Sequence, residues 1–388
     1  MFQNTNTSDI YDFLYDYNSA KIADKLGSKP RVVVGLSGGV DSSVAAAMLV
    51  DRGFDVIALT ITPFKVDETC RPIDNPKNCC TLNGYADAID VSRRLNIPHK
   101  FMDLTESFRQ NVIENFKEEY LQGRTPNPCA RCNPMIKWTG ILQKADEYGA
   151  DFVATGHYAK IKYLPESKRY VIARGNDHKK DQSYFLWGLT QAQLSRTIFP
   201  LGDLTKAQTR ALAEKYDIPI AQKPESQEIC FIPNNDYHSY LNKNIPELDK
   251  LSPSGDIVMD DKVIGSHQGI YQYTIGQRKG LGLSHKDPLF VKRIDPEKNL
   301  IVVDTESNLY SDSLTAKDVN LIKYNSLNPE NKFLVKIRYR DEGFPAACSI
   351  DEAGQLHIKF DESRRAISPG QSVVMYEGDD LVGGAVIV

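Results

Sequence analysis

The stretch Arg31–Ser43, RVVVGLSGGVDSS, decides the fold of this chain. Arg31–Leu36 has the apolar character of a buried strand, and Val44–Leu49 continues as a helix that packs through its alanines. The glycines of the intervening turn let the backbone bend tightly, and N–H groups at the start of the helix can hold a phosphate. We therefore predict that this turn is an ATP-binding loop.

The alternatives for this turn can be weighed from its sequence. It is not a Walker loop, because no Gly-Lys-Ser/Thr follows to place a lysine on the β- and γ-phosphates. An ordinary strand-to-helix turn can also contain Ser-Gly-Gly, but the full S-G-G-x-D-S between a strand and a helix favours a nucleotide site. Asp41 is a candidate for holding Mg²⁺ against the phosphates, although at this position it could equally cap the helix.

Strands and helices alternate over Arg31–Gly156, with further apolar strands at Phe54–Ile61 and Phe152–Thr155. This alternation predicts a doubly wound parallel sheet with helices on both faces. Two T-x-x-Q capping boxes then open short helices, from Thr190 to Gln193 and from Thr205 to Gln208.

The last third of the chain has a different pattern. From Asp256 onwards, short runs of Val, Ile, Leu and Tyr are broken by Gly, Asn and Pro, which is typical of an antiparallel β-domain, here a small barrel. We therefore expect an α/β fold with an N-terminal doubly wound sheet, a small central domain and a C-terminal β-barrel. The expected ranges are 1–29 for an N-terminal arm, 30–222 for the ATP-binding domain, 223–290 for the central domain and 291–388 for the barrel.

Composition limits the class of protein. A chain of 388 residues with 41% hydrophobic and 25% charged residues is globular and long enough for two or three domains, which excludes disorder, collagen and coiled coil. The formal net charge of −4 means that a nucleic-acid partner would need a local basic patch. We find no apolar stretch of membrane-spanning length and no signal-peptide pattern, so we expect a cytoplasmic protein with no membrane partner.

The 7 cysteines are an odd number without an export signal, which favours metal, redox or nucleophilic roles over a disulfide framework. Cys129 and Cys132 form a C-x-x-C after Thr125–Pro128, whose two prolines stiffen the approach. Such a pair can be a redox couple or half of a zinc site, but no nearby C-x-x-C or H-x₃-H completes the metal site. The remaining candidates are Cys230 and the group Cys70, Cys79 and Cys80, which lies in a Pro- and Asn-rich loop where a second metal site or chance exposure is expected.

A basic run extends from Lys160 to Lys180 and is interleaved with tyrosines. Its cations are Lys160, Lys162, Lys168, Arg169, Arg174, Lys179 and Lys180, and its aromatics are Tyr158, Tyr163, Tyr170 and Tyr184. Cations for phosphates together with aromatics for unstacked bases suit a single-stranded RNA loop, although a run of charge is more often only a solvated face.

The nucleotide loop resembles that of the PP-loop ATP pyrophosphatases, and nine segments narrow the resemblance to the tRNA-uridine 2-sulfurtransferases, or tRNA-specific 2-thiouridylases. The segments are GLSGGVDSS (35–43), GRTPNP (123–128), CN-x-x-IKW (132–138), ATGHYA (154–159), KDQSYFL (180–186), ICFI (229–232), GQRKGLG (276–282), IRYR (337–340) and SPGQSV (368–373). The resemblance implies ATP-dependent 2-thiolation of the wobble uridine in tRNA anticodons. In that reaction the uridine C2 oxygen is adenylated, and sulfur is then transferred from a cysteine persulfide.

The resemblance also implies the site residues. Cys230 would carry the persulfide, and Cys132 would be the nucleophile that releases it. The implied ATP-binding residues are Gly35, Leu36, Ser37, Gly38, Gly39, Val40, Asp41, Ser42, Ile61 and Gly156. The implied tRNA-binding residues are Asn127, Pro128, Cys129, His157, Lys180, Asp181, Gln182, Arg338, Tyr339 and Gln371. The implied partners are a tRNA with a wobble uridine and a sulfur-donor protein, and ATP and Mg²⁺ are the expected cofactors.

Cys129 departs from the family pattern, in which the best-known members have Asp after TPNP. The missing carboxylate puts a strict copy of the two-cysteine mechanism in doubt. Cys129, Cys132 and Cys230 together supply three thiolates, which is enough to hold a [4Fe–4S] cluster with one iron open for sulfide. We favour the persulfide, because its two cysteines match the family by position, and keep the cluster as the alternative.

Two other classes of function compete with this interpretation. A PP-loop ligase that activates a small carboxylate or amide would have no need of Cys129, Cys132 and Cys230. A non-catalytic RNA-binding protein with a vestigial nucleotide loop would have no need of an intact Gly38, Gly39 and Asp41. ATP-dependent release of pyrophosphate separates the enzymes from the non-catalytic protein.

Overall fold

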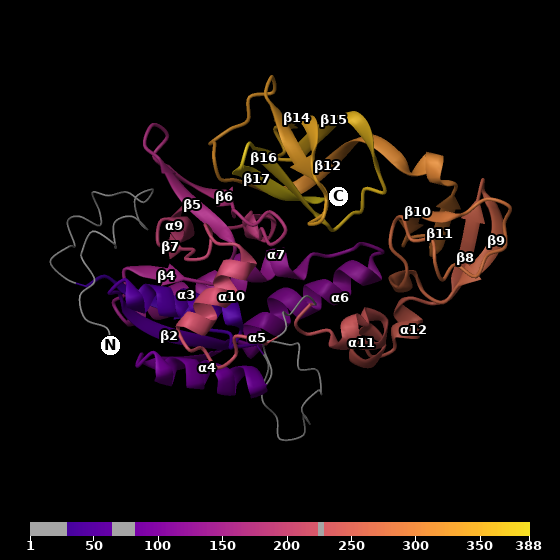
Figure 1. Cartoon of the computed structure of the whole chain (residues 1–388). Coiled ribbons are helices and arrows are strands. Elements are labelled where there is room, and N and C mark those ends of the chain that lie inside the picture. The colour runs from indigo at the N-terminus through magenta and orange to yellow at the C-terminus, as the bar shows by residue number, and fades with distance from the viewer. Residues whose placement is uncertain (1–28, 64–81, 224–228) are drawn as a thin grey trace.

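The structure is a computed structural model that describes residues 29–63, 82–223 and 229–388 (Figure 1). Within these residues the strands form a parallel sheet, a small central sheet and a sheet that closes into a barrel. In Figure 1 the barrel lies above the α/β part, and the central sheet lies on the right, at the opposite end of the molecule from β2 (Asp55–Thr62).

The first part of the chain holds the parallel sheet and its helices. Its elements are β1 (Arg31–Gly35), α3 (Val40–Asp51), β2 (Asp55–Thr62), α4 (Leu82–Arg94), β3 (His99–Asp103), α5 (Thr105–Phe108), η1 (Arg109–Ile113), α6 (Glu114–Leu121), α7 (Pro128–Cys132), η2 (Asn133–Trp138), α8 (Thr139–Glu147), β4 (Phe152–Ala154), β5 (Ala159–Leu164), β6 (Arg169–Arg174), η3 (Ser183–Leu186), α9 (Gln191–Leu194), β7 (Thr197–Ile198) and α10 (Lys206–Lys215).

The remaining elements belong to the central and C-terminal parts. They are η4 (Pro233–Asn235), α11 (Tyr237–Asn244), α12 (Leu248–Leu251), β8 (Gly255–Met259), β9 (Lys262–His267), η5 (Ile270–Gln272), β10 (Phe290–Asp295), β11 (Leu300–Asp304), η6 (Glu306–Leu309), β12 (Tyr310–Leu321), β13 (Lys332–Lys336), β14 (Phe344–Ile350), β15 (Leu356–Arg365), β16 (Ser372–Glu377) and β17 (Asp380–Ile387).

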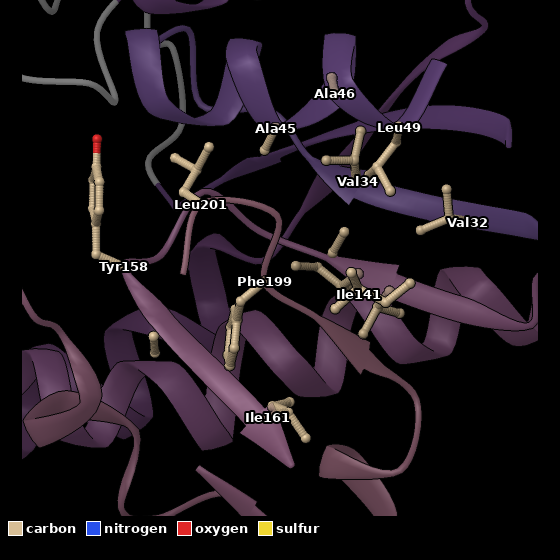
Figure 2. Close-up of a cluster of buried hydrophobic side chains, with 14 of the residues drawn as sticks. Val32, Val34, Ala45, Ala46, Leu49, Ile141, Tyr158, Ile161, Phe199 and Leu201 are labelled. Carbon is tan, nitrogen blue, oxygen red and sulfur yellow. The ribbon is translucent and has the colours of Figure 1, made fainter. Parts of the chain in front are cut away.

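The parallel sheet has the order β3-β2-β1-β4-β7, and every neighbouring pair in it is parallel. Val32 and Val34 of β1 are fully buried, and Figure 2 shows Ala45 and Leu49 of α3 beside them. Small alanines let the helix approach the sheet closely. The predicted strand, turn and helix at 31–49 are confirmed, and so is the doubly wound sheet.

Both predicted capping boxes are confirmed. The Thr190 and Thr205 side chains accept hydrogen bonds from the backbone N–H groups of Gln193 and Gln208, and each glutamine side chain accepts from the N–H of its threonine. The caps begin α9 and α10 and fix where α10 approaches the parallel sheet.

The central sheet has the order β10-β11-β8-β9. The expected domain boundary between residues 290 and 291 falls inside β10, which is held in this sheet by antiparallel pairing with β11. Pairing across the sheet cannot be recognised from a change in local composition. We therefore propose that the central domain continues to Asp304.

The C-terminal strands form the predicted barrel. Within residues 310–387, β12 pairs with both β15 and β17, so the strands β12-β15-β14-β13-β16-β17 close on themselves. The β5–β6 hairpin of the first domain extends this sheet through pairing of Ala173 with Asp380 (Figure 1). Lys162 adds an ion pair to Asp380 at 3.0 Å, so the hairpin joins the first domain to the barrel.

No helix in the described parts of the chain is both long enough and apolar enough to span a membrane.

Candidate active site and RNA interface

The nucleotide loop, Ser37–Ser42, is held in shape by its own hydrogen bonds. Ser42 Oγ donates to the carbonyl of Gly39 at 3.1 Å and accepts from the N–H of Ser37 at 3.2 Å. Gly38 has a φ of +72°, and a Cβ at this position would lie 2.0 Å from the carbonyl oxygen of Gly84. The tight turn therefore requires glycine at position 38.

Gly156 brings a second segment against this loop. It follows β4, which neighbours β1 on the side away from β2. A Cβ on Gly156 would lie 2.6 Å from the backbone nitrogen of Ser42. The loops after β1 and β4 thus meet where the strand order changes direction, which is where open α/β sheets bind ligands.

The other residues expected to bind ATP lie around the same end of the sheet. Ile61 is close to the end of β2, the neighbour of β1, and is partly buried. Leu36 is buried, and its backbone N–H donates to the carbonyl of Leu59 at 2.9 Å. Leu36 therefore anchors the loop to the sheet, while Ser37–Ser42 and Gly156 face one another.

Asp41 does not cap α3. The N-cap residue is Gly39, and no side chain makes a capping hydrogen bond there. Asp41 Oδ1 instead accepts from Lys206 Nζ at 2.6 Å and lies 2.9 Å from the Tyr158 hydroxyl. Figure 2 shows that this hydroxyl points away from the apolar side chains around it.

Two lysines flank the nucleotide loop and were not anticipated from the sequence. Lys206 begins α10, and Lys223 Nζ donates to the carbonyl of Gly38 at 3.1 Å and to Asp87 at 2.6 Å. A Walker loop carries its lysine within its own motif, whereas here both come from segments far along the chain. A lysine directly after the N-cap residue Thr205 was the available signal for Lys206.

Cys132 and Cys230 border one buried cluster. This cluster is centred on Phe108, Phe116 and Phe231, and both cysteines pack against it. Both side chains are partly buried, while Cys129 is exposed. The structure thus brings two cysteines from distant segments to a common surface.

The positions of the cysteines test the alternative that they bind a metal ion or an iron–sulfur cluster. Within the described residues, no group of three or more His, Cys, Asp or Glu side chains is placed to hold a metal ion. Cys129, Cys132 and Cys230 therefore do not fit a three-thiolate cluster as they are arranged. Cys70, Cys79 and Cys80 lie outside the described residues.

His157 links the cysteine helix to the nucleotide loop. It follows Gly156, and its Nδ1 lies 2.8 Å from Thr155 Oγ1. Its ring is 5.6 Å from that of Trp138, which ends the helical segment that continues from Cys132. Burial, and then the nearby Lys137, hold the pKa of His157 well below its ordinary value, so the imidazole is neutral at pH 7.

The loop Gly123–Asn127 lies at a domain junction. A Cβ on Gly123 would lie 2.4 Å from Ile294 of the central sheet, and the barrel residue Gln371 donates through Nε2 to the carbonyls of Thr125 and Pro126 at 3.1 and 3.3 Å. Asn127 then begins α7 by accepting from the N–H of Ala130 at 3.2 Å. We call this contact of three domains around residues 123–127 the domain junction.

Family models cover the described domains in order. A model described as the tRNA methyl transferase HUP domain matches residues 30–234, one described as the tRNA methyl transferase PRC-barrel domain matches 239–305, and the aminomethyltransferase beta-barrel domain matches 311–387. The chain is 46% identical over 357 residues to tRNA-specific 2-thiouridylase MnmA 1 of Caldanaerobacter subterraneus subsp. tengcongensis, covering 92% of this chain and 97% of that protein. The chain belongs to the tRNA-specific 2-thiouridylase family.

Other relatives agree with this assignment. The tRNA-specific 2-thiouridylase MnmA of Salinibacter ruber is 44% identical, with 92% of this chain and 94% of that protein covered. Among solved structures, a 4-thiouridine synthetase–RNA complex with bound ATP is 18% identical with a TM-score of 0.32, covering 57% of this chain and 52% of that one. This TM-score is too low to bear on function.

The barrel residues that the 2-thiouridylase family resemblance assigns to tRNA lie near the domain junction. The Tyr339 ring is 4.6 Å from that of Phe185, which directly follows Tyr184. Arg338 Nη2 donates to the backbone carbonyls of Arg365 and Ala366. Pro128 is buried at the start of α7. The Tyr339 ring is also 6.0 Å from that of Tyr184, whose hydroxyl donates to the carbonyl of Ser372, the residue after Gln371. Tyr339 therefore lies near the loop that Gln371 bonds and that leads to Asn127.

The KDQ segment of the family is bonded within the protein. Asp181 is buried and accepts from the N–H groups of Gly175 and Ser183 and from the Ser183 hydroxyl. Gln182 exchanges hydrogen bonds with the Tyr158 backbone, at 2.9 Å through its own N–H and 3.0 Å through Oε1. Lys180 is partly exposed. Gln182 thus positions Tyr158, which in turn contacts Asp41.

The prediction that the basic run forms a stacking surface is wrong for most of its members. Tyr158, Tyr170 and Tyr184 are buried, so their rings cannot meet a base. Arg169 donates to the barrel carbonyls of Leu321 and Ile322 at 2.8 and 2.7 Å. The cation–aromatic pattern arises here from packing of the hairpin on the barrel.

Proposed function

We propose that this chain is an ATP-dependent sulfurtransferase that thiolates C2 of the wobble uridine in tRNA anticodons. Relatives 42–46% identical over more than nine tenths of the chain bear the name tRNA-specific 2-thiouridylase. One geometric observation carries the proposal, which is that Cys132 and Cys230, from distant segments, pack against one buried cluster. The helical segment that continues from Cys132 ends at Trp138, whose ring lies 5.6 Å from that of His157 beside the nucleotide loop.

The first step is adenylation of the uridine. The C2 oxygen attacks the α-phosphate of ATP, the bond to the β-phosphate breaks, and pyrophosphate leaves. The backbone of Gly38 and Gly39 would bind the pyrophosphate, because N–H groups at the start of α3 favour an anion. Lys206 and Lys223 would offset the charge of the leaving group from the two sides of the loop.

The Mg²⁺ that accompanies ATP would be held by Asp41. Mg²⁺ bound with nucleotides commonly takes one or two carboxylates together with phosphate oxygens. Asp41 presents a carboxylate beside the loop, and its present partner Lys206 is a cation that Mg²⁺ can replace. The metal would neutralise phosphate charge, while Tyr158 keeps the carboxylate in place through its 2.9 Å contact.

The second step is sulfur transfer. The terminal sulfur of a Cys230 persulfide attacks C2, and AMP leaves with the former C2 oxygen. The Cys132 thiolate then attacks Sγ of Cys230, so the bond between the two persulfide sulfurs breaks and 2-thiouridine is released. The products on the protein are joined in a Cys132–Cys230 disulfide, and an external dithiol must supply two electrons to reduce it.

The proposal also includes a sulfur donor and a cellular location. A sulfur-donor protein that carries its own persulfide must recharge Cys230, because the transferred sulfur is consumed in each cycle. We place the reaction in the cytoplasm, where ATP, tRNA and reducing thiols occur together.

The test uses the full chain with ATP, Mg²⁺, a persulfide donor and unmodified tRNA. Pyrophosphate release is followed directly, and wobble 2-thiouridine is quantified by mass spectrometry after nuclease digestion. We expect Cys230→Ser to retain tRNA-dependent pyrophosphate release and to form no 2-thiouridine. Cys348→Ala, in the buried core of the barrel, is the matched control and should retain both.

Two outcomes contradict the proposal. Wild-type protein that releases pyrophosphate only with a small carboxylate or amide, and not with tRNA, is a ligase. Wild-type protein that binds tRNA without any pyrophosphate release is a non-catalytic RNA-binding protein.

A further inference from the structure

The loop Gly276–Gly282, GQRKGLG, carries cations for which the mechanism gives no role. Arg278 and Lys279 are exposed, and neither pairs with an acidic side chain among the described residues. The whole chain has a formal net charge of −4. Two neighbouring cations on this exposed loop therefore have the opposite sign to the net charge of the protein. Such a local excess of positive charge favours an anionic partner.

The loop is rigidly built. Its backbone is tied to β10 by hydrogen bonds from Gly276 N–H to the Val291 carbonyl at 2.7 Å and from Val291 N–H to the Gln277 carbonyl at 2.9 Å. The Gln277 side chain cross-links the loop, accepting from the N–H of Thr274 and donating to the carbonyl of Lys279, both at 3.0 Å. Arg278 and Lys279 are therefore held out at a fixed position.

The loop abuts the barrel. A Cβ on Gly276 would lie 2.7 Å from Cβ of Ala366 and 3.5 Å from Nη1 of Arg365. Arg338 donates to the carbonyls of the same two barrel residues. In Figure 1, β10 is the strand of the central sheet nearest the barrel. Three separate segments thus place arginines and a lysine around one corner, which we call the basic corner.

The basic corner also contains an aromatic side chain and few acids. Tyr310 pairs with Arg365 in the β12–β15 ladder and is half exposed. Glu306 pairs with Arg365 at 3.0 Å, and Asp341 accepts a hydrogen bond from the N–H of Ile337, the residue before Arg338. Neither of these two carboxylates forms an ion pair with Arg278 or Lys279.

We propose that the basic corner binds the phosphodiester backbone of the substrate tRNA, with Arg278 and Lys279 as its principal contacts. This inference rests on the proposed function, because it assumes that tRNA is the substrate. The corner is continuous with the domain junction through Ala366, Ser368 and Gln371, and Gln371 bonds the loop that leads to Asn127. An RNA whose target base lies near the cysteines therefore meets this corner with another part of its backbone.

The experiment measures tRNA affinity of the full chain at several salt concentrations without ATP. We expect Arg278→Ala/Lys279→Ala to weaken binding roughly 10- to 100-fold at low salt and to lower the slope of log K against log salt by about 1.5 to 2. The exchange Arg278→Lys/Lys279→Arg keeps both charges and should keep the slope. Thiolation at saturating tRNA and pyrophosphate release per bound tRNA should stay within about twofold of wild type.

A matched control uses two exposed lysines of the same domain, Lys262→Ala/Lys298→Ala, in β9 and in the β10–β11 turn. This variant removes the same charge and should leave the slope unchanged. An equal loss of slope in the control and the corner variant would overturn the proposal, because only net charge would then matter.

Two other results separate the possible failures. Normal tRNA binding by the corner variant, together with impaired thiolation from a persulfide-carrying donor protein but not from a small-molecule persulfide, would assign the corner to the donor and overturn the RNA proposal. Wild-type protein that fails to bind tRNA at any salt would instead overturn the proposed function.

Discussion

The nucleotide loop is built from neighbouring residues, whereas the domain junction is assembled from three domains. In the loop, Ser37, Gly39 and Ser42 bond one another within a single turn. At the junction, Thr125 accepts from Gln371, which lies 246 positions along the chain. A local site is specified by a short motif, but an assembled site also depends on how its domains dock.

The two sites also differ in how tightly they are packed. A Cβ on Gly38 would lie 2.0 Å from the backbone oxygen of Gly84 in α4, so the clash could be relieved only by a shift of α4. The junction instead relies on side-chain hydrogen bonds, each of which contributes about 0.5 to 1.5 kcal/mol. We therefore expect a substitution in the loop to abolish activity or leave it unchanged, and a substitution at the junction to reduce activity partially.

The largest effect is expected from Gly38→Ala. The added Cβ would clash with the carbonyl of Gly84, and the positive φ disfavours alanine. We expect tRNA-dependent pyrophosphate release to fall more than about 100-fold, while tRNA binding stays near wild type. Measurements are initial rates of pyrophosphate release and a filter-binding titration with tRNA.

Gly39→Ala is the matched control for this prediction. At Gly39 an added Cβ would meet only Ser37 Oγ at 3.4 Å, and its φ of −99° suits any residue. The Gly39→Ala variant without bound ligands should therefore have a melting temperature within a few degrees of wild type. If Gly38→Ala is as stable and active as Gly39→Ala, the tight packing of the loop has no functional role.

At the junction, Gln371→Ala tests the graded response. It removes hydrogen bonds to the carbonyls of Thr125 and Pro126, worth about 1 to 2 kcal/mol together. We expect kcat/KM for thiolation to fall about tenfold and ATP affinity to stay unchanged, because the nucleotide loop does not depend on this contact. Gln355→Ala, in an exposed barrel turn, should leave both unchanged. A parallel loss of ATP affinity would show that the two sites are not separable.

The contrast between local and assembled sites explains what could be predicted from sequence. The strand at Arg31–Gly35, the loop after it and the caps at Thr190 and Thr205 each depend on residues within a few positions of one another, so their patterns were sufficient. Arg169 was misinterpreted, because its partners Leu321 and Ile322 lie about 150 positions away. No local pattern distinguishes a cation that binds RNA from one that joins two domains.

The same reason applies to the lysines at the nucleotide loop. Lys223 reaches Gly38 only because the chain after α10 returns to the parallel sheet, and that path depends on tertiary packing. Cys132 and Cys230 could be paired from the family resemblance, while their packing against one buried cluster is visible only in the fold.

A smaller effect is expected from His157, which follows Gly156 beside the nucleotide loop. Its pKa is lowered in the folded chain by burial and then by Lys137, so the folded protein keeps it neutral where the unfolded chain, with an ordinary value near 6.5, takes up a proton. Stability therefore rises with pH through 6.5 and is lost as the pH falls below it. The slope from one such group is at most about 1.4 kcal/mol per pH unit.

Denaturant unfolding of wild type and His157→Gln between pH 7.5 and 5.5 measures this slope. The variant should lose less stability on acidification than wild type. Other histidines with lowered pKa, namely His99, His238 and His267, are present in both proteins and give a common background. Equal slopes for the two proteins would contradict the assignment of a neutral imidazole to His157.

The smallest effect is expected from Cys129→Ser, although this position departs from the family pattern. Cys129 is exposed on α7, whereas Cys132 and Cys230 both pack against the buried cluster of Phe231. A thiol outside the exchanging pair is not consumed, so we expect thiolation to stay within about threefold of wild type. A three-thiolate cluster would give the opposite result, because two remaining ligands seldom retain a [4Fe–4S] unit. Iron content and visible absorption of protein purified without oxygen, measured beside activity, distinguish the two. Joint loss of iron, colour and activity in Cys129→Ser would replace the persulfide route with the cluster, and would require the three cysteines to approach one another more closely than they do here.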